Sequence, residues 1–438
     1  MSRFDARTAA AVVIANMVGT GVFTSLGFQL LEIDSGFVLL MLWAVGGVAA
    51  LCGAMCYAEL GAALPGSGGE YHFLSEIYHP AAGFISGWIS ATVGFAAPTA
   101  LAALTFGSYL GSAFPGLPAT LLATLLIIGL CIAHSGSHQR SGLAQSMLTA
   151  LKLLLIVGFC SIALWRADNP QPVDFAPGAG DGDLLLGGAF AISLIYVNYA
   201  FSGWNAATYI SGELEQPQRT LPWVLLGSTL LVGLLYLLLN AVFLWVAPME
   251  AMRGKVEVGF VAAGFVFGES GAALMGCLMA LLLVSTVSAM ILAGPRVLHR
   301  IGEDIPAFRA LGTLNQHGIP QRAVLLQGAI SLFMLWTASF ERILVFSGAI
   351  MALNTLFAVA GLFLLRWRAP TLARPYRVSL YPLPPLLFLL ITGWTLFYTL
   401  AQRPIEGALC IAIVASGAAF YWLSLRLGPQ RGNTTHEL

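Results

Sequence analysis

Two short clusters combine small residues with polar side chains inside otherwise apolar stretches of the chain. They are residues 16–23 (NMVGTGVF) and 198–205 (NYAFSGWN). A helix that unwinds at such a point exposes carbonyl groups on one side of the break and amide N–H groups on the other, which can hold an ammonium group and a carboxylate respectively. The chemistry that these residues predict is therefore the binding of a zwitterion.

The residues of the first cluster have specific expected roles. Gly19 and Gly21 would let the backbone approach a ligand without a clashing Cβ atom, and the Thr20 hydroxyl could donate to a carboxylate. For either cluster alone, small residues that merely allow close helix packing would be the preferred interpretation. Two breaks at mid-depth, five predicted spans apart, instead favour a transporter built from two repeats of opposite topology.

Lys152 is a cation inside another apolar stretch. It lies nine residues after Leu143, or ~13 Å into the bilayer at helical rise, which is too deep for its side chain to reach the headgroups comfortably. A buried ammonium group needs acceptors, and we consider the carbonyls freed at the first break and the hydroxyls of Ser285 and Thr286. Those hydroxyls would be equally satisfied by a carbonyl of the preceding turn. An error in the span boundary would instead leave Lys152 near the interface.

The composition indicates what kind of scaffold positions these residues. Of the 438 residues, 58% are hydrophobic and 9% are charged, and the mean hydropathy is +0.84, whereas soluble domains carry about 25% charged residues. This excludes a soluble enzyme. The apolar runs are long and do not alternate, so they predict membrane-spanning helices rather than a barrel of strands. Twenty basic and twenty acidic residues cancel, so no net charge points to nucleic acid.

Charged residues, glycines and prolines divide the chain into twelve predicted spans. The first and sixth contain the two clusters, the fifth contains Lys152, and the eighth contains Ser285 and Thr286. The apolar stretch 258–268 is too short to cross and is predicted to lie in the interface or to re-enter. The predicted spans are 9–31, 37–63, 82–111, 119–135, 143–165, 184–212, 221–247, 270–297, 322–339, 342–366, 380–401 and 405–426.

The basic residues are unevenly distributed between the predicted loops. With the N-terminus inside, fourteen of the twenty lie in cytoplasmic segments, five lie outside and Lys152 lies within a span. Loops rich in lysine and arginine stay on the cytoplasmic side of a membrane. We therefore predict a multi-pass protein of the cell membrane with both termini in the cytoplasm.

Two further signals have less specific interpretations. Glu59, near the inner end of the second span, is either a proton carrier or, as its place near the interface favours, the partner of a loop arginine. His134 and His138 are spaced i, i+4, but no cysteine or carboxylate joins them, so we expect solvated side chains rather than a metal site. We expect no metal and no cofactor.

Several of these motifs together resemble the amino acid–polyamine–organocation superfamily, and in particular the bacterial relatives of the L-type amino-acid transporters. The resemblance covers nearly the whole chain. The motifs that carry it are 19–23 (GTGVF), 57–60 (YAEL), 65–71 (PGSGGEY), 151–153 (LKL), 201–205 (FSGWN), 213–217 (ELEQP) and 294–296 (GPR).

The resemblance implies an all-α membrane protein of twelve transmembrane helices that works by alternating access. One transporter domain, 1–438, would contain two inverted five-helix repeats at 9–165 and 184–366, in which helices 1 and 6 are broken. Two peripheral helices would follow within 380–426.

The resemblance also implies roles for individual residues. The substrate carboxylate would meet Thr20 and Gly21, and the amino group would meet the carbonyls of Met17, Tyr199 and Ser202. Tyr199 would also be an aromatic gate, and Lys152 would stand in place of a sodium ion. The candidate substrate-binding residues are Met17, Gly19, Thr20, Gly21, Tyr199, Ala200, Ser202 and Asn205; the candidate gates are Tyr199 and Trp204; and the candidate coupling residues are Lys152, Ser285 and Thr286.

Together these observations predict a secondary transporter for neutral L-amino acids. It would work by exchange or proton coupling, independently of sodium, as a monomer in the lipid bilayer without an obligatory protein partner. One alternative is a cationic amino-acid or polyamine carrier, which Lys152 disfavours as the one cation of the predicted pocket. The others are a membrane-embedded transferase, expected to show clustered catalytic side chains, and an ion channel, expected to show a ring of pore charges or a filter repeat.

Overall fold

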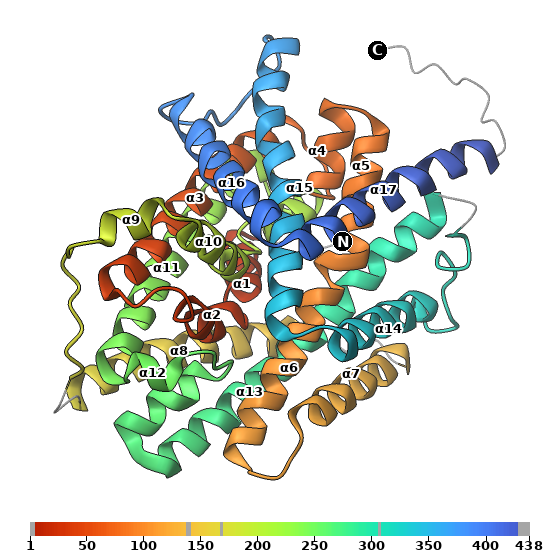
Figure 1. The fold of residues 1–438 in the computed structure, drawn as a ribbon. Coiled ribbons are helices and arrows are strands. Elements are labelled where there is room, and N and C mark those ends of the chain that lie inside the picture. Colours follow the sequence, from red (N-terminus) through yellow and green to blue (C-terminus); the bar gives the residue numbers. More distant parts are fainter. Residues whose placement is uncertain (1–4, 137–141, 167–169, 305–307, 428–438) are drawn as a thin grey trace.

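The structure is a computed structural model that describes residues 5–136, 142–166, 170–304 and 308–427. Within these ranges all regular secondary structure is helical (Figure 1). Nine helical stretches among the described residues are long and apolar enough to cross a membrane. The described part of the chain is thus all-α with apolar spans, as the sequence predicts.

The elements comprise long helices and short ones that connect or interrupt them. In chain order they are α1 (Ala6–Met17), α2 (Gly21–Gln29), α3 (Gly36–Ala63), α4 (Glu70–Ile77), α5 (Pro80–Ile89), η1 (Ser90–Gly94), α6 (Ala96–Ala113), α7 (Ala119–Gly136), α8 (Gly142–Arg166), α9 (Asp181–Leu186), α10 (Gly188–Phe201), η2 (Ala206–Glu213), α11 (Pro217–Val246), α12 (Met249–Met252), α13 (Val258–Asp304), α14 (Gln321–Thr337), α15 (Phe340–Arg368), α16 (Leu383–Gln402) and α17 (Pro404–Leu427).

Each predicted span corresponds to one helix or to a helix with an interruption. The predicted first span is divided into α1 and α2, the third into α5, the π-helical turn η1 and α6, and the sixth into α10 and η2. The three predicted spans outside the nine long stretches are those of α7, α10 and α14, which are helical but shorter. The count of twelve crossings stays a prediction.

The stretch 258–268 is helical and is set off by a break from the helix that follows, and its place in the interface stays a prediction. It forms the first part of α13, which continues to Asp304 with a break at Gly268, where φ is 71° and ψ is −172°. A positive φ costs a glycine little because it has no Cβ atom. The backbone N–H of Gly259 in this part donates to the Tyr109 hydroxyl of α6 at 3.0 Å, so the stretch is tied to the neighbouring helix.

The helices pack unevenly between the centre and the periphery. Near the centre, α3 packs against α11, and α6 against α13, while α7 and α14 lie side by side (Figure 1). In the most apolar 18-residue segment of α15, 67% of the residues are buried, whereas in the corresponding segment of α17 only 11% are buried. Helix α17 therefore lies at the edge of the bundle, as expected for one of the two peripheral helices.

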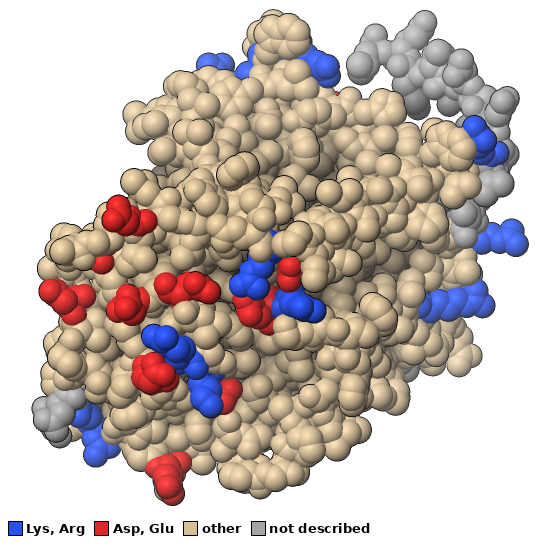
Figure 2. All heavy atoms as spheres, in the orientation of Figure 1, with Lys and Arg blue, Asp and Glu red and all other residues tan. Residues whose placement is uncertain are grey.

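The surface agrees with a membrane environment. On the face drawn in Figure 2 most of the surface is uncharged, and acidic and basic side chains gather in a few clusters. Trp165, Trp223 and Trp367 are 83%, 82% and 78% exposed, and they lie near the ends of α8, α11 and α15. Tryptophan is enriched where helices leave the lipid, so the apolar surface and these helix ends fit a multi-pass membrane protein.

Candidate functional site

The first predicted break is present between α1 and α2. Helix α1 ends at Met17 and α2 begins at Gly21, and Val18 between them is not helical, with φ −74° and ψ 76°. The N–H of Gly19 turns back to the Met17 carbonyl at 2.7 Å. The break therefore leaves carbonyls at the end of α1 and N–H groups at the start of α2, as predicted from the sequence.

The second predicted break is present between α10 and η2. Helix α10 ends at Phe201, and Ser202 turns the chain with ψ 137°. Gly203 follows with φ +102°, a conformation that favours glycine. The chain then continues through residues 206–213 as a 3-10 helix rather than the predicted α-helix.

The two breaks lie against each other. A Cβ atom on Gly21 would lie 2.6 Å from the Ala200 Cβ, and one on Gly203 would lie 2.7 Å from the Asn16 Cβ. Both glycines are therefore required by backbone packing, which is the alternative that the sequence left open for the small residues. A Cβ on Gly19 would meet nothing nearer than the Met17 carbonyl oxygen at 3.8 Å, so Gly19 faces open space.

A polar contact joins the same two segments. The hydroxyl oxygens of Thr20 and Tyr199 lie 3.3 Å apart, and either can be the donor. Further along, the Ser25 hydroxyl of α2 donates to the Tyr196 carbonyl of α10 at 3.2 Å. Helices α2 and α10 thus pair along their length next to the breaks.

A cavity of about 300 Å³ opens where the breaks meet. All eight candidate substrate-binding residues line it, as do both candidate gates and Thr286, whereas Lys152 and Ser285 do not. Pockets for small molecules range over about 300–1,000 Å³, so the volume suits a small ligand. The candidates that line it are Met17, Gly19, Thr20, Gly21, Tyr199, Ala200, Ser202, Trp204, Asn205 and Thr286.

Lys152 is buried beside the cavity rather than in its wall. Its side chain is 3% exposed, as expected for a group that faces the interior of the bundle. Its ammonium group donates to the Thr286 hydroxyl at 2.8 Å, linking α8 to α13. Of the two predicted acceptor sets, the hydroxyl is present, and the described hydrogen bonds include none from Lys152 to a carbonyl of the first break. Ser285 bonds instead to the Leu282 carbonyl of its own helix.

Tyr236 of α11 is a site residue that the sequence analysis missed. Its hydroxyl donates to the Met17 carbonyl at 2.6 Å and lies 3.1 Å from the Ala200 carbonyl. The Tyr236 hydroxyl therefore contacts one carbonyl oxygen at each break. The sequence shows only a tyrosine within an apolar stretch, which does not indicate its partners.

Glu70, at the start of α4, is the only charged side chain among the residues that line the cavity. It is 2% exposed and accepts hydrogen bonds from Tyr57 at 2.8 Å, from Tyr209 at 2.5 Å and from the Asn205 amide. The sequence analysis noted Glu70 only within a motif. Lys152, expected to be the one cation of the pocket, contacts Thr286 from behind the wall, and the charged side chain in the described wall is the Glu70 carboxylate.

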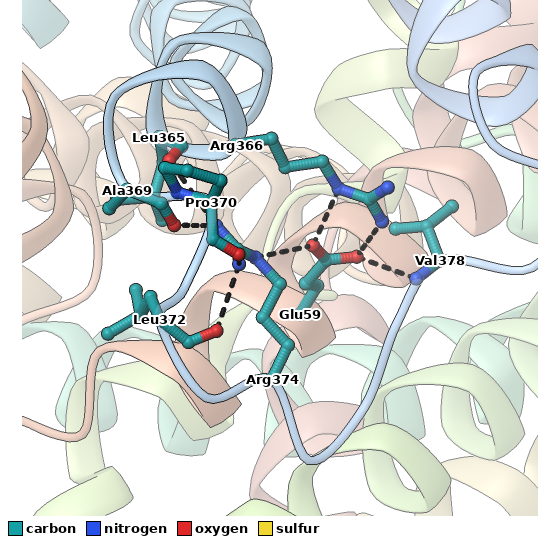
Figure 3. A network of polar contacts seen from close by, with 8 residues as sticks. All are labelled: Glu59, Leu365, Arg366, Ala369, Pro370, Leu372, Arg374 and Val378. Carbon is teal, nitrogen blue, oxygen red and sulfur yellow. Dashed lines mark hydrogen bonds and ion pairs between the residues drawn. The ribbon is translucent and has the colours of Figure 1, made fainter.

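Glu59 is fully buried in a network at the end of α3 (Figure 3). Its carboxylate accepts from Arg366 Nε at 2.8 Å and Arg366 Nη2 at 2.6 Å, and from the Val378 N–H at 2.6 Å. Arg374 Nε lies 3.5 Å from it. The predicted pairing with a loop arginine is confirmed, and the network ties α3 to the end of α15 and to the loop that follows.

His134 corrects another expectation. It is 6% exposed rather than solvated, and its Nε2 lies 2.8 Å from the Ser288 hydroxyl of α13. His138 lies outside the described residues.

The comparisons with known proteins agree with this architecture. The chain is 28% identical to the large neutral amino acids transporter small subunit 2 of Mus musculus, over 95% of this chain and 80% of that protein. It is 26% identical to the serine/threonine exchanger SteT of Bacillus subtilis (strain 168), over 94% of each, and 27% identical to the Asc-type amino acid transporter 1 of Mus musculus, over 95% and 80%. The amino acid permease family model matches residues 4–420. The chain therefore belongs to the amino acid permease family, whose members are transporters and not enzymes.

Proposed function

We propose that this protein carries neutral L-amino acids across the cell membrane by alternating access. The single observation that carries the proposal is the meeting of two broken helices at one cavity, which is lined by the end of α1, the start of α2 and the end of α10. A free amino acid carries an ammonium group and a carboxylate on the same carbon atom. Two helix ends of opposite polarity are suited to that pair.

The carboxylate of the amino acid would lie at the start of α2, and its ammonium group would lie at the carbonyl ends of α1 and α10. Its carboxylate binds the N–H groups at the start of α2 and the Thr20 hydroxyl. Its ammonium group binds the carbonyls of Met17, Tyr199 and Ser202. In this structure the Met17 carbonyl accepts from the Gly19 N–H and from the Tyr236 hydroxyl, so an ammonium group that binds there takes the place of one of these two donors.

The size and charge of the cavity favour a neutral side chain. About 300 Å³ leaves room for a small or medium amino acid. The carboxylate of Glu70 would attract a cationic side chain, but both of its oxygens already accept hydrogen bonds from this chain. The names of the three relatives, which refer to large neutral amino acids, to serine and threonine, and to Asc-type transport of amino acids, support the same class.

We infer that transport does not depend on sodium. Lys152 and Thr286 connect α8 to α13 next to the first break, and a fixed ammonium group at this place would supply the positive charge that a metal ion supplies in a sodium-coupled carrier. Movement by exchange fits the relative that is named an exchanger.

We infer twelve crossings, in two inverted five-helix repeats followed by two peripheral helices, with both termini in the cytoplasm. The nine long apolar stretches, the three shorter helices in the predicted places and the exposed position of α17 support this arrangement. We propose that one chain suffices for transport, without an obligatory protein partner.

The test is transport by the purified protein in liposomes. Labelled alanine, serine, leucine, arginine and putrescine are each added to liposomes with and without unlabelled amino acid inside. Each condition is measured in sodium buffer and again in choline buffer. We expect uptake of the neutral amino acids, stimulated by internal amino acid and unchanged when choline replaces sodium. Uptake of none of them, or of putrescine or arginine alone, would overturn the proposal.

A further inference from the structure

Glu70 occupies an unusual place for a carboxylate. It lines the cavity and is almost completely buried, where an ionised group without a counter-charge is costly. No basic side chain among the described residues contacts it. Within the described part of the chain its hydrogen bonds come from Tyr57, Asn205 and Tyr209, which are neutral groups.

The two buried acids, Glu59 and Glu70, differ in what their partners can do. The partners of Glu59 are two arginines and a backbone N–H, which can only donate, so a proton on Glu59 would break these contacts. A tyrosine hydroxyl can donate or accept. Either Tyr57 or Tyr209 can therefore accept the one hydrogen bond that a protonated Glu70 donates, while the other carboxylate oxygen continues to accept.

Of the charged and titratable side chains described on the elements around Glu70, Tyr209 is the one that also lines the cavity. Three basic side chains on neighbouring elements have other partners: Arg366 pairs with Glu59, Arg368 donates to the Ile77 carbonyl, and His79 accepts from the Ala81 N–H. The described titratable or charged side chains on the elements packed around Glu70 are Arg7 on α1, Cys52, Cys56, Tyr57 and Glu59 on α3, Tyr71, His72 and Glu76 on α4, Tyr78 and His79 before α5, Tyr209 on η2, and Glu341, Arg342, Arg366 and Arg368 on α15. Only Glu70 among the acids lines the cavity.

We propose that Glu70 is a proton-binding site that couples amino-acid movement to proton movement. This rests on the proposed transport function and specifies its second cargo. The proton comes from water in the cavity, binds one carboxylate oxygen, and returns to water when the cavity faces the other side. No bond of the amino acid changes, and the charge of Glu70 alternates between −1 and 0.

Proton binding also reaches the second broken helix. Asn205 and Tyr209 hold the start and the middle of η2 to the Glu70 carboxylate. Hydrogen bonds to an ionised acceptor are roughly twice as strong as neutral ones. Protonation therefore weakens the attachment of η2 to α4 and favours its movement, while deprotonation restores it.

The experiment compares the wild type with Glu70→Gln and with a matched control, Glu76→Gln. Glu76 lies on the same helix but is exposed, so the control makes the same chemical change away from the cavity. Each protein is reconstituted into liposomes that contain a pH-sensitive dye, and labelled serine is added outside. The dye reports proton uptake and the label reports serine uptake. We expect the wild type and Glu76→Gln to take up protons with serine at about one to one, and Glu70→Gln to show no serine-dependent proton uptake.

A second measurement decides the case if Glu70→Gln moves no serine. Calorimetry of serine binding in two buffers of different ionisation enthalpy gives the number of protons taken up per serine bound. We expect a pH-dependent proton uptake in the wild type and its loss in Glu70→Gln. Serine transport by the wild type without proton movement, or equal proton uptake by Glu70→Gln, would overturn the inference while leaving amino-acid transport intact. No serine transport or binding by any variant would overturn both.

Discussion

Replacing Gly21 by alanine tests whether the two broken helices meet as closely as the structure indicates. The new Cβ would lie 2.6 Å from the Ala200 Cβ and 3.0 Å from its backbone nitrogen, whereas ordinary contacts begin at 3.4 Å. The segments must therefore separate by on the order of 1 Å. Because the obstructing atoms belong largely to backbone rather than to a flexible side chain, we expect a cost of about 1–3 kcal/mol.

The same displacement separates groups that bind the substrate. If the penalty falls on the bound state, 1–3 kcal/mol lowers the affinity for a neutral amino acid by about 5–150-fold. The assay is substrate binding by purified protein in detergent, with the thermal unfolding midpoint measured in parallel. Gly21→Ala should lower both the affinity and the midpoint.

Gly19→Ala is the matched control. Its Cβ would meet only the Met17 carbonyl oxygen at 3.8 Å, so we expect an unfolding midpoint close to that of the wild type. Equal midpoints and equal affinities for Gly21→Ala and the wild type would refute the close approach of the two breaks.

Three further substitutions test other contacts of the site. Tyr236→Phe removes the donor to the Met17 carbonyl, and we expect a loss of about 1–3 kcal/mol in substrate binding or stability; an unchanged affinity and midpoint would contradict the contact. Lys152→Ala should reduce transport to background at normal expression, and near-normal rates would argue against a central role. Glu59→Ala leaves Arg366 and Arg374 without their shared partner, so we expect about 3–5 kcal/mol of destabilisation in thermal unfolding, and an unchanged midpoint would be the contrary result.

The sequence predicted the features that depend on local chemistry. Glycines and polar residues inside apolar runs located both breaks, and the depth of Lys152 in its span predicted its burial. These inferences work because lipid provides no partners for backbone or charged groups, so an exception within an apolar span has few explanations.

The sequence did not predict the features that depend on distant partners. Glu70 meets Tyr57 from 13 residues away and Asn205 from 135 residues away, and Tyr236 meets Met17 across 219 residues. The residue types near each position in the sequence do not indicate these distant partners. For the same reason Gly19 and Gly21 looked equivalent, although only Gly21 faces the backbone of another segment.

The central claim is that two helix ends of opposite polarity hold the two charges of one small molecule. The most direct measurement is competition against bound labelled leucine by compounds that share its side chain, namely leucine itself, isopentylamine without the carboxylate and 4-methylpentanoate without the amino group. The account predicts that leucine displaces the label and that neither single-charged compound does so at hundredfold higher concentration. Displacement by either one at concentrations similar to leucine would contradict it.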